Sequence, residues 1–293
     1  MLIYNPKDWL HFLFRIHKSD TLRKLFPLML FVMVFSLAVA YWEIEYLHLS
    51  DTSWVKNIPV MHSLLGFAIS ILLVFRTNTA YDRWWEGRKL WGGLVNNSRN
   101  LALKLNVILE PEDKDNRSFF VKTIPLYATA LKEHLQSEGT RFMLDENAHP
   151  ELAALDMQKH VPNQIAKVIM QRTHNLYREQ KITGEQLLFL NSELTSFTDI
   201  CGACERIKNT PIPYSYSAFI KKFIFVYVMT LPFGYVFSLG YYVAPMVMFV
   251  FYVMASMELV AEEIEDPFGH DANDLPMAKM AGNIEKHVLE IID

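Results

Sequence analysis

The sequence has only two cysteines among 293 residues, and its formal net charge is only −4. Two cysteines cannot build a disulfide framework. The small net charge, without basic clusters that alternate with aromatics, argues against a nucleic-acid partner. The chain also lacks HExxH, GxSxG and a glycine-rich phosphate loop. These motifs carry metal, nucleophile and phosphate chemistry, so we expect no catalytic residues, no cofactor and no enzyme activity.

Period-two alternation is also missing over any long stretch, and we therefore expect no sheet. Hydrophobic residues make up 51% of the chain and aromatics 13%, yet 20% of the residues are charged. The apolar residues are concentrated in long runs, which a soluble protein avoids, while a pure bundle of membrane helices would carry less charge. This composition indicates an all-α protein with a membrane part joined to a helical cytosolic part.

The run from Ile58 to Arg76 contains no acid, and no Lys or Arg before its last residue. Its length is sufficient for a helix to cross the hydrocarbon core of a bilayer. Three further apolar runs have similar lengths, with a reversal expected near Ser238–Gly240. They are Leu25–Trp42, Phe223–Phe237 and Tyr241–Leu259. The chain is therefore predicted to have four transmembrane helices.

Lys and Arg are abundant at Arg15–Lys24 and Arg76–Lys89, while the connector Tyr46–Asn57 has only Lys56. The positive-inside rule then places both termini in the cytoplasm, in a multi-pass membrane protein. The N-terminus lacks the small-residue cleavage site of a signal peptide. We divide the chain into 1–24, a cytosolic or interfacial helix; 25–76, transmembrane helices 1 and 2; 77–219, a cytosolic helical domain; 220–260, transmembrane helices 3 and 4; and 261–293, a cytosolic C-terminal segment.

Helical spacing predicts several helices in the cytosolic part of the chain. They cover Arg83–Leu109, Ser118–Glu138 with an interruption or kink at Pro125, Pro162–Gln180 and Gly184–Ile207. The last contains Cys201 and Cys204 with C-x-x-C spacing. A structural zinc site needs four ligands, and no strand precedes this pair as in redox motifs. We interpret the two cysteines as small residues at a tight helix contact.

The helix predicted from Ile58 to Arg76 carries two different stripes. One is small and weakly polar, and the other, about 100° away, is apolar. Small faces usually let membrane helices approach closely, whereas an apolar stripe can face lipid or form a hydrophobic constriction in a pore. The small stripe is Pro59, Ser63, Gly66 and Ser70, and the apolar stripe is Val60, Leu64, Phe67 or Ala68, Ile71 and Phe75. Periodicity alone leaves both assignments open.

Three separated motifs resemble the signatures of the bestrophin family, in its bacterial branch. They are FRTNTAYDRWWEGRKLWG at 75–92, CERIKNTPIPYSY at 204–216, and EDPFG followed by NDLP at 265–276. The resemblance implies a homopentameric ion channel in the lipid bilayer, with a pore on the five-fold axis. It implies that Val60, Leu64 and Ala68 point into the pore and form its neck. Family members commonly carry a larger residue at the position of Ala68, and Phe67 is its bulkier neighbour here.

The resemblance also implies a second constriction at the cytosolic exit, which falls on Glu185 and the adjacent Gln186. Family members carry an apolar side chain there, and a ring of carboxylates would favour cations. Bacterial relatives have been regarded as favouring monovalent cations, so we expect small monovalent ions with a cation preference. The alternative is an anion (chloride) channel of the same architecture. A carboxylate at the first turn of a helix is also favourable by itself.

An acidic tract runs from Glu258 to Asp274. Carboxylates at close spacing suit a hard cation such as Ca²⁺, although the tract lacks the EF-hand pattern. Animal bestrophins clasp Ca²⁺ with the run after Asp-Pro-Phe-Gly, but this sequence lacks two of those carboxylates. The candidate cation site is Asp266, Asp271, Asn273 and Asp274. A membrane-bound metal-dependent enzyme that uses this tract, or a scaffold built on the cytosolic insert, remain alternatives of another class.

Overall fold

The computed structural model describes residues 21–48, 57–136, 156 and 159–292. The expected N-terminal helix at 1–24 lies mostly outside the described residues. All the regular structure in the described ranges is helical, which confirms the all-α fold. The helices are α2 (Thr21–Tyr41), its π-helical extension η1 (Trp42–Tyr46), α3 (Ile58–Ile108), α4 (Lys114–Gln136), α5 (Val161–Arg178), α6 (Gly184–Asn209), α7 (Tyr214–Leu239), the 3-10 turn η4 (Gly240–Tyr242), α8 (Val243–Glu265) and α9 (Met277–Ile292).

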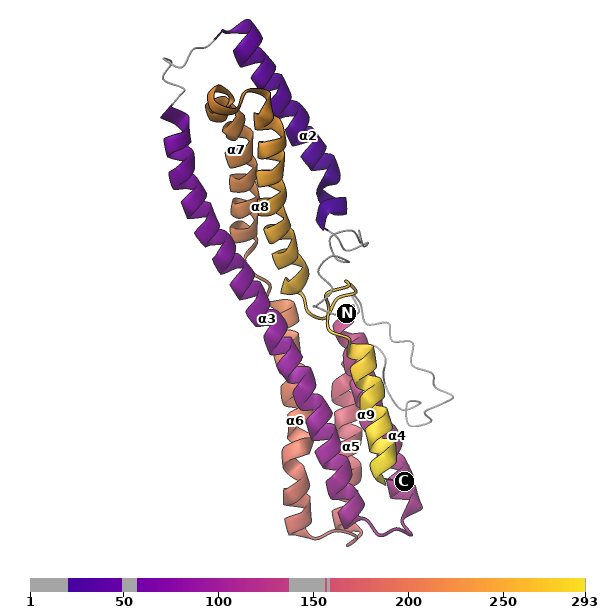
Figure 1. Ribbon diagram of the computed structural model, residues 1–293. Helices are drawn as coiled ribbons and strands as arrows, with labels where there is room; N and C mark the ends of the chain where they lie inside the picture. The colour runs from indigo at the N-terminus through magenta and orange to yellow at the C-terminus, as the bar shows by residue number, and fades with distance from the viewer. Residues whose placement is uncertain (1–20, 49–56, 137–155, 157–158, 293) are drawn as a thin grey trace.

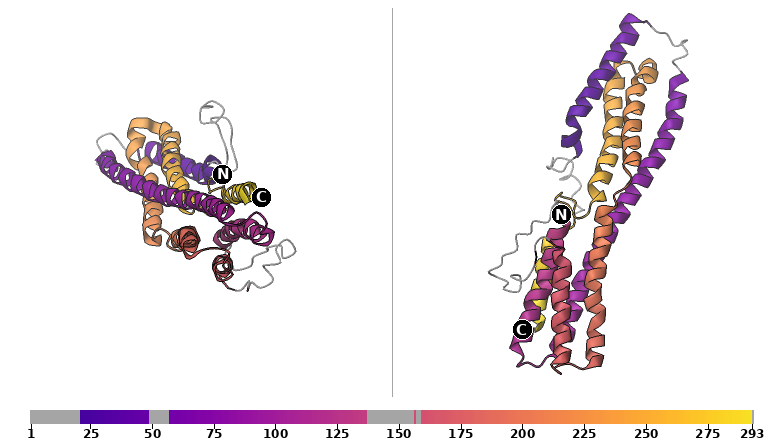
Figure 2. Two further views of the ribbon diagram at one scale, coloured as in Figure 1. Left: turned by 90° about the horizontal axis from the view of Figure 1, so that it is seen from below. Right: turned by 180° about the vertical axis from the view of Figure 1, so that it is seen from behind.

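The helices form two bundles stacked end to end, and α3 runs through both (Figure 1). The upper bundle consists of α2, the first half of α3, α7 and α8. The lower bundle consists of the second half of α3 with α4, α5, α6 and α9. The view from behind shows the same elongated arrangement, and the view from below looks along its long axis (Figure 2). Each bundle has its own cluster of buried apolar side chains.

Three helical stretches are long and apolar enough to cross a membrane. They are Thr21–Tyr46, Ile58–Ile108 and Tyr214–Glu265. The third folds back on itself at Gly240, whose φ of 54° suits a residue without a Cβ. It therefore supplies two neighbouring helices, α7 and α8, which run in opposite directions (Figure 1). The number of membrane crossings stays a prediction.

The second half of α3 is the central helix of the lower bundle. Its buried residues lie at helical spacing and pack against α6, α4 and α9. Large side chains from several of these helices meet with no exposed surface, and most are apolar. They include Trp91, Leu94, Leu101, Phe120 and Tyr127. Burial of this size stabilises the lower bundle by the hydrophobic effect without any help from a membrane.

Two expectations about helices differ from the structure. α4 is not interrupted at Pro125, which is buried inside the helix. The C-terminal segment contains α9, a helix that the sequence analysis did not predict. Its buried residues recur on one face and cover α3 and α4. They are Met277, Met280, Ala281, Ile284, Val288 and Ile292.

Candidate ion pathway and the junction behind it

Two residues of the small stripe of α3, Pro59 and Gly66, lie against α7, whereas Ser63 and Ser70 are exposed. A Cβ added to Gly66 would lie 2.7 Å from the hydroxyl oxygen of Tyr227. A Cβ added to Gly234 of α7 would lie 2.9 Å from Cγ2 of Ile58 and 3.0 Å from Cδ of Pro59. Both helices therefore need glycine where they meet, as expected for small residues between membrane helices.

His62 fixes the rotation of α3 about its axis. Its imidazole is buried, with Nε2 3.0 Å from Oγ1 of Thr230 on α7 and Nδ1 3.1 Å from the carbonyl of Ile58. Ile69 and Leu73, on the same side of α3, are buried in the core of the upper bundle. The apolar stripe consequently points away from the bundle.

The predicted neck residues are exposed in the single chain. Val60 is 65% exposed, Leu64 64% and Phe67 70%, and Ala68 is exposed as well. They form a continuous apolar face with no partner among the described residues of the chain. Such a face is suited either to lipid or to copies of the same helix around a pore. The four residues share one surface, and their place in a neck stays a prediction.

The predicted aperture residues lie at the start of α6, at the far end of the lower bundle (Figure 1). Gln186 is part of a capping box with Thr183. Its side-chain Oε1 accepts from the backbone amide of Thr183 at 2.8 Å, and its backbone amide donates to Oγ1 of Thr183 at 3.2 Å. Glu185 is exposed, and hydrogen bonds at the helix start hold the pKa of its carboxyl below the usual value. Its aperture role stays a prediction.

An ion-pair cluster joins the two bundles where α3 leaves the upper one. Arg76, only 1% exposed, donates from Nη2 to Oε2 of Glu265 at 2.7 Å, and its Nε lies 3.5 Å from Oε2 of Glu258. The other oxygen of Glu265 accepts from the amide of Ile212 at 2.6 Å. The C-terminal part of α8 and the linker between α6 and α7 are thereby both connected to Arg76 of α3.

About two turns further along α3, Arg83 extends the same cluster. Its Nε donates to the carbonyl of Glu265 at 3.0 Å. Its two terminal nitrogens donate to the carbonyls of Ile207 and Thr210, both at 2.5 Å. These carbonyls belong to the last turn and the C-cap of α6, where a cation is favoured by the helix dipole.

The loop after α8 covers Gly87 of α3. A Cβ at Gly87 would lie 3.1 Å from both Cγ of Pro267 and Cζ of Phe268, so the loop approaches the helix backbone closely. Nε1 of Trp84 donates to the carbonyl of Asn273 at 3.0 Å. The three motifs that resemble bestrophin signatures therefore meet at one place. The motifs are evident in the sequence, but their meeting at this junction is not, because residues up to 189 positions apart form it.

The candidate cation residues lie in that same loop. An amide hydrogen of Asn273 is donated to Oε2 of Glu263 at 2.7 Å, and Oδ2 of Asp274 accepts from the amide of Asp271. Oδ1 of Asp274 is buried without a hydrogen-bond partner. Burial raises the pKa of Asp274 to about 6, with a further contribution from the charges of Asp271 and Asp266. Cation binding at this loop stays a prediction.

Cys201 and Cys204 are buried as free thiols within α6, in the core of the lower bundle. Burial raises the pKa of Cys201 to about 12 and also raises that of Cys204. Thiols that stay protonated are poor nucleophiles and poor metal ligands. This environment agrees with the interpretation of the pair as packing residues.

Comparison with known proteins places this geometry in a family. Residues 1–290 match the family described as "Bacterial/Fungal Bestrophin protein". The "voltage-dependent anion channel-forming protein sll1024" of Synechocystis is 31% identical over 296 residues, covering 98% of this chain and 93% of the relative. The "voltage-dependent anion channel-forming protein YneE" of Escherichia coli K12 is 30% identical over 294 residues, covering 100% of this chain and 94% of the relative.

Solved structures agree. A variant of a bacterial bestrophin homologue from Klebsiella pneumoniae superposes with a TM-score of 0.79 at 30% identity, covering 92% of this chain and 100% of that one. The molecule is thus an all-helical membrane protein of the ion-channel class and not an enzyme. The chain belongs to the bestrophin family. Both curated relatives are named for anions, so the expected cation preference finds no support in them.

Proposed function

We propose that the chain forms a homopentameric channel of a bacterial inner membrane, with four transmembrane helices per chain and both termini in the cytoplasm. Small monovalent ions pass along the five-fold axis. The neck is formed by Val60, Leu64 and Ala68, with Phe67 beside them. The observation that carries this proposal is the exposed apolar stripe of α3, whose rotation is fixed by His62. Five copies of that face around an axis give a hydrophobic constriction that gates by dewetting.

We propose anions as the conducted ions, because the curated relatives are named as anion channel-forming proteins. One observation favours the second candidate, cation passage. Glu185 is exposed at the start of α6, and its carboxylate keeps its charge at neutral pH because its pKa is lowered. Five such carboxylates around an exit would attract cations.

Reversal potentials separate the two candidates. Purified protein in a planar bilayer under a KCl gradient is expected to reverse towards the chloride equilibrium potential. A reversal potential near the potassium value would establish the cation candidate instead. Glu185→Gln is then expected to shift the potential towards chloride, whereas Glu285→Gln, an equally exposed glutamate on α9, leaves it unchanged. A protein that conducts nothing and migrates as a monomer contradicts the whole proposal.

Single-channel conductance tests the neck. Leu64→Ala widens an apolar constriction and is expected to raise conductance several-fold by lowering the dewetting barrier. Leu30→Ala removes an exposed leucine of α2 and serves as the matched control, with unchanged conductance. Equal conductance of the wild type and Leu64→Ala argues for the scaffold alternative.

A hard cation at Asp266, Asp271, Asn273 and Asp274 is proposed as a second, separate feature of the channel. The unpaired Oδ1 of Asp274 supports it, because a buried carboxylate oxygen is costly without a partner. Ca²⁺ at millimolar concentration is expected to raise the melting temperature of the wild type and not of Asp274→Asn. The same shift in both proteins would remove this proposal.

A further inference from the structure

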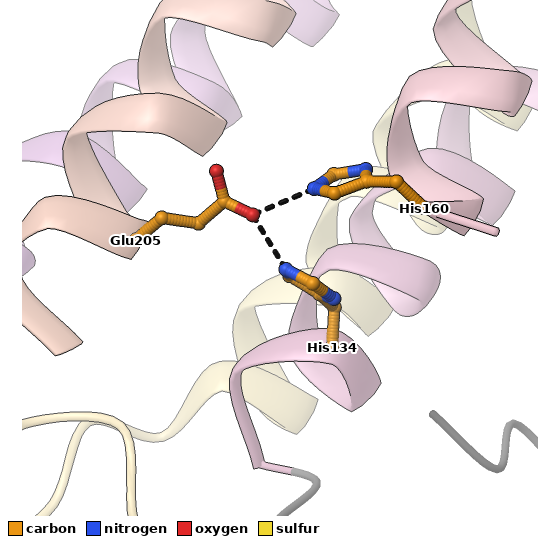
Figure 3. Close-up of side chains that lie close together, drawn as sticks. All are labelled: His134, His160 and Glu205. Atoms are coloured by element: carbon orange, nitrogen blue, oxygen red, sulfur yellow. Dashed lines mark hydrogen bonds and ion pairs between the residues drawn. The ribbon is translucent and has the colours of Figure 1, made fainter. Parts of the chain in front are cut away.

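Two histidines and a glutamate meet at the membrane-side end of the lower bundle. His134 lies in the last turn of α4, His160 immediately precedes α5, and Glu205 lies in α6. Nε2 of each histidine lies 2.6 Å from the same oxygen, Oε1 of Glu205. Figure 3 shows the two imidazoles converging on that carboxylate from separate helices. Over the described part of the chain, this is the one trio of His, Cys, Asp or Glu whose ligand atoms lie within 4.8 Å of one another.

We propose that His134, His160 and Glu205 form a site for a divalent transition metal of the zinc class. Two imidazole nitrogens and one carboxylate oxygen are a ligand set that Zn²⁺ accepts, and a fourth position stays open to water or another ligand. This site is separate from the apolar stripe of α3 and from the acidic loop, and it does not depend on either proposal above.

The geometry needs only a small adjustment. Zinc bonds of about 2.0–2.2 Å in a tetrahedral site hold neighbouring ligand atoms about 3.3 Å apart. The nitrogens now lie 2.6 Å from the oxygen, so each must retreat by less than an ångström. The imidazole centroids are 4.4 Å apart and tilted by 52°, which leaves both rings free of stacking. The three side chains are 21–30% exposed, so an ion can enter from solvent.

The surrounding charge is mixed. Burial lowers the pKa of His134. Burial acts to raise the pKa of Glu205, but its two histidine hydrogen bonds outweigh this effect and lower it. Nζ of Lys208 donates to the carbonyl of His134 at 3.3 Å and places a positive charge beside the site. Imidazole binds a metal in its neutral form, so the ligand set of two imidazoles and one carboxylate carries a charge of −1 towards a divalent ion.

Metal binding has one identifiable cost in hydrogen bonding. Nδ1 of His160 accepts the amide hydrogen of Asn163 at 3.1 Å and so caps α5. A neutral imidazole that binds metal through Nε2 carries its proton on Nδ1, and it can no longer accept. The capping bond is therefore exchanged for a metal bond. Asn163 is exposed, so water can take over its amide hydrogen.

Because of the position of the site, a bound metal ion would link three helices of the lower bundle. It would tie together the end of α4, the start of α5 and the C-terminal part of α6. Two residues after His134, the amide of Gln136 donates to the carbonyl of Gly269 at 3.0 Å. The clamped end of α4 is thereby bonded to the loop that covers Gly87 at the junction between the bundles.

Zinc titration of the full-length protein tests the proposal. The protein is purified in detergent without a polyhistidine tag, stripped with EDTA and titrated with ZnCl₂ by calorimetry. One Zn²⁺ per chain is expected. His134→Gln and Glu205→Gln should weaken binding by more than about 100-fold, since even outer-shell changes cost 10- to 100-fold. Zn²⁺ should also raise the melting temperature of the wild type only.

Two further variants keep the result interpretable. His160→Asn removes the ligand but retains a good N-cap residue, so it should fold normally and lose Zn²⁺. His174→Asn changes an exposed histidine of α5 outside the trio and should bind Zn²⁺ as the wild type does. The proposal is overturned if the wild type takes up no stoichiometric Zn²⁺, or if His160→Asn binds it equally tightly. In either case the trio is a hydrogen-bonded contact alone.

Discussion

The two bundles bury their apolar residues to very different extents. In the most apolar windows of the three membrane candidates, only 33%, 17% and 28% of the residues are buried within the chain. In the lower bundle, large side chains such as Trp91, Phe120 and Phe197 have almost no exposed surface. Water drives the lower core together, whereas lipid gives apolar helices little reason to associate. Within the chain, the upper bundle therefore depends on close contacts of small residues and on buried polar pairs.

The largest expected effect comes from comparing two phenylalanines, one in each bundle. Phe120→Ala empties a fully buried site in the lower core and is expected to lower the free energy of unfolding by about 3–5 kcal/mol. Phe31→Ala on α2, where the ring is 52% exposed, should change it by less than about 1 kcal/mol. Thermal denaturation in detergent, followed by circular dichroism, measures both. Similar losses would show that the upper helices rely equally on packing within one chain.

The junction between the bundles is tested by two glutamates of α8. Glu265→Gln removes a negative charge that compensates the buried guanidinium of Arg76. This change is expected to lower the free energy of unfolding by about 3 kcal/mol. Glu262→Gln breaks an ion pair with Lys221 that is half exposed and should cost about 0–1 kcal/mol. The midpoint of chemical denaturation compares them. If Glu262→Gln is the more damaging, the bundles are not held together at Arg76.

A smaller effect is expected from two glycines in helices. Gly87→Ala places a Cβ 3.1 Å from Pro267 and Phe268, and this overpacking should cost about 1–3 kcal/mol. Gly202→Ala in α6 has no neighbour within 4 Å of the new Cβ and should stabilise the helix by up to about 1 kcal/mol. Opposite signs of the change in melting temperature would support the close approach of the loop to α3, and equal signs would contradict it.

The smallest effect concerns pH. The carboxyl of Asp274 has a pKa of about 6 in the folded protein, against about 3.9 in an unfolded chain. Between these values the folded state binds more protons, so stability decreases as pH rises from about 4 to about 6. In Ca²⁺-free buffer, Asp274→Asn should flatten the dependence of melting temperature on pH over this window. Asp199→Asn, at an exposed position of α6, should leave the wild-type slope.

Much of the fold is predictable because the helices show long apolar runs or apolar residues at helical spacing. The polar residues Glu110 to Asp113 mark the end of α3, and the reversal falls at Gly240 as expected. The wrong or missing elements have local reasons. Pro125 is accommodated inside α4, where the surrounding core over-rides the usual effect of proline. α9 was not predicted, although its buried residues recur at helical spacing.

The contacts of the site were less predictable than the elements. Arg76 and Glu265 are 189 residues apart, and no local pattern indicates that they pair. The same holds for His134, His160 and Glu205, which come from three different helices and form no sequence motif. The family resemblance supplied the neck and aperture residues. The structure adds that the side chain of Gln186 takes part in the capping box of α6, and the aperture role stays a prediction.

α3 is one unbroken helix of 51 residues, which at about 1.5 Å per residue is a rod of about 76 Å. A rod has no joint at which motion of one half can be absorbed. A tilt of only about 3° at one end displaces the other by about 4 Å at this length. If the upper end of α3 tilts outwards, the lower bundle must therefore be displaced as well. Because one stiff helix runs through both bundles, motions at its two ends are coupled.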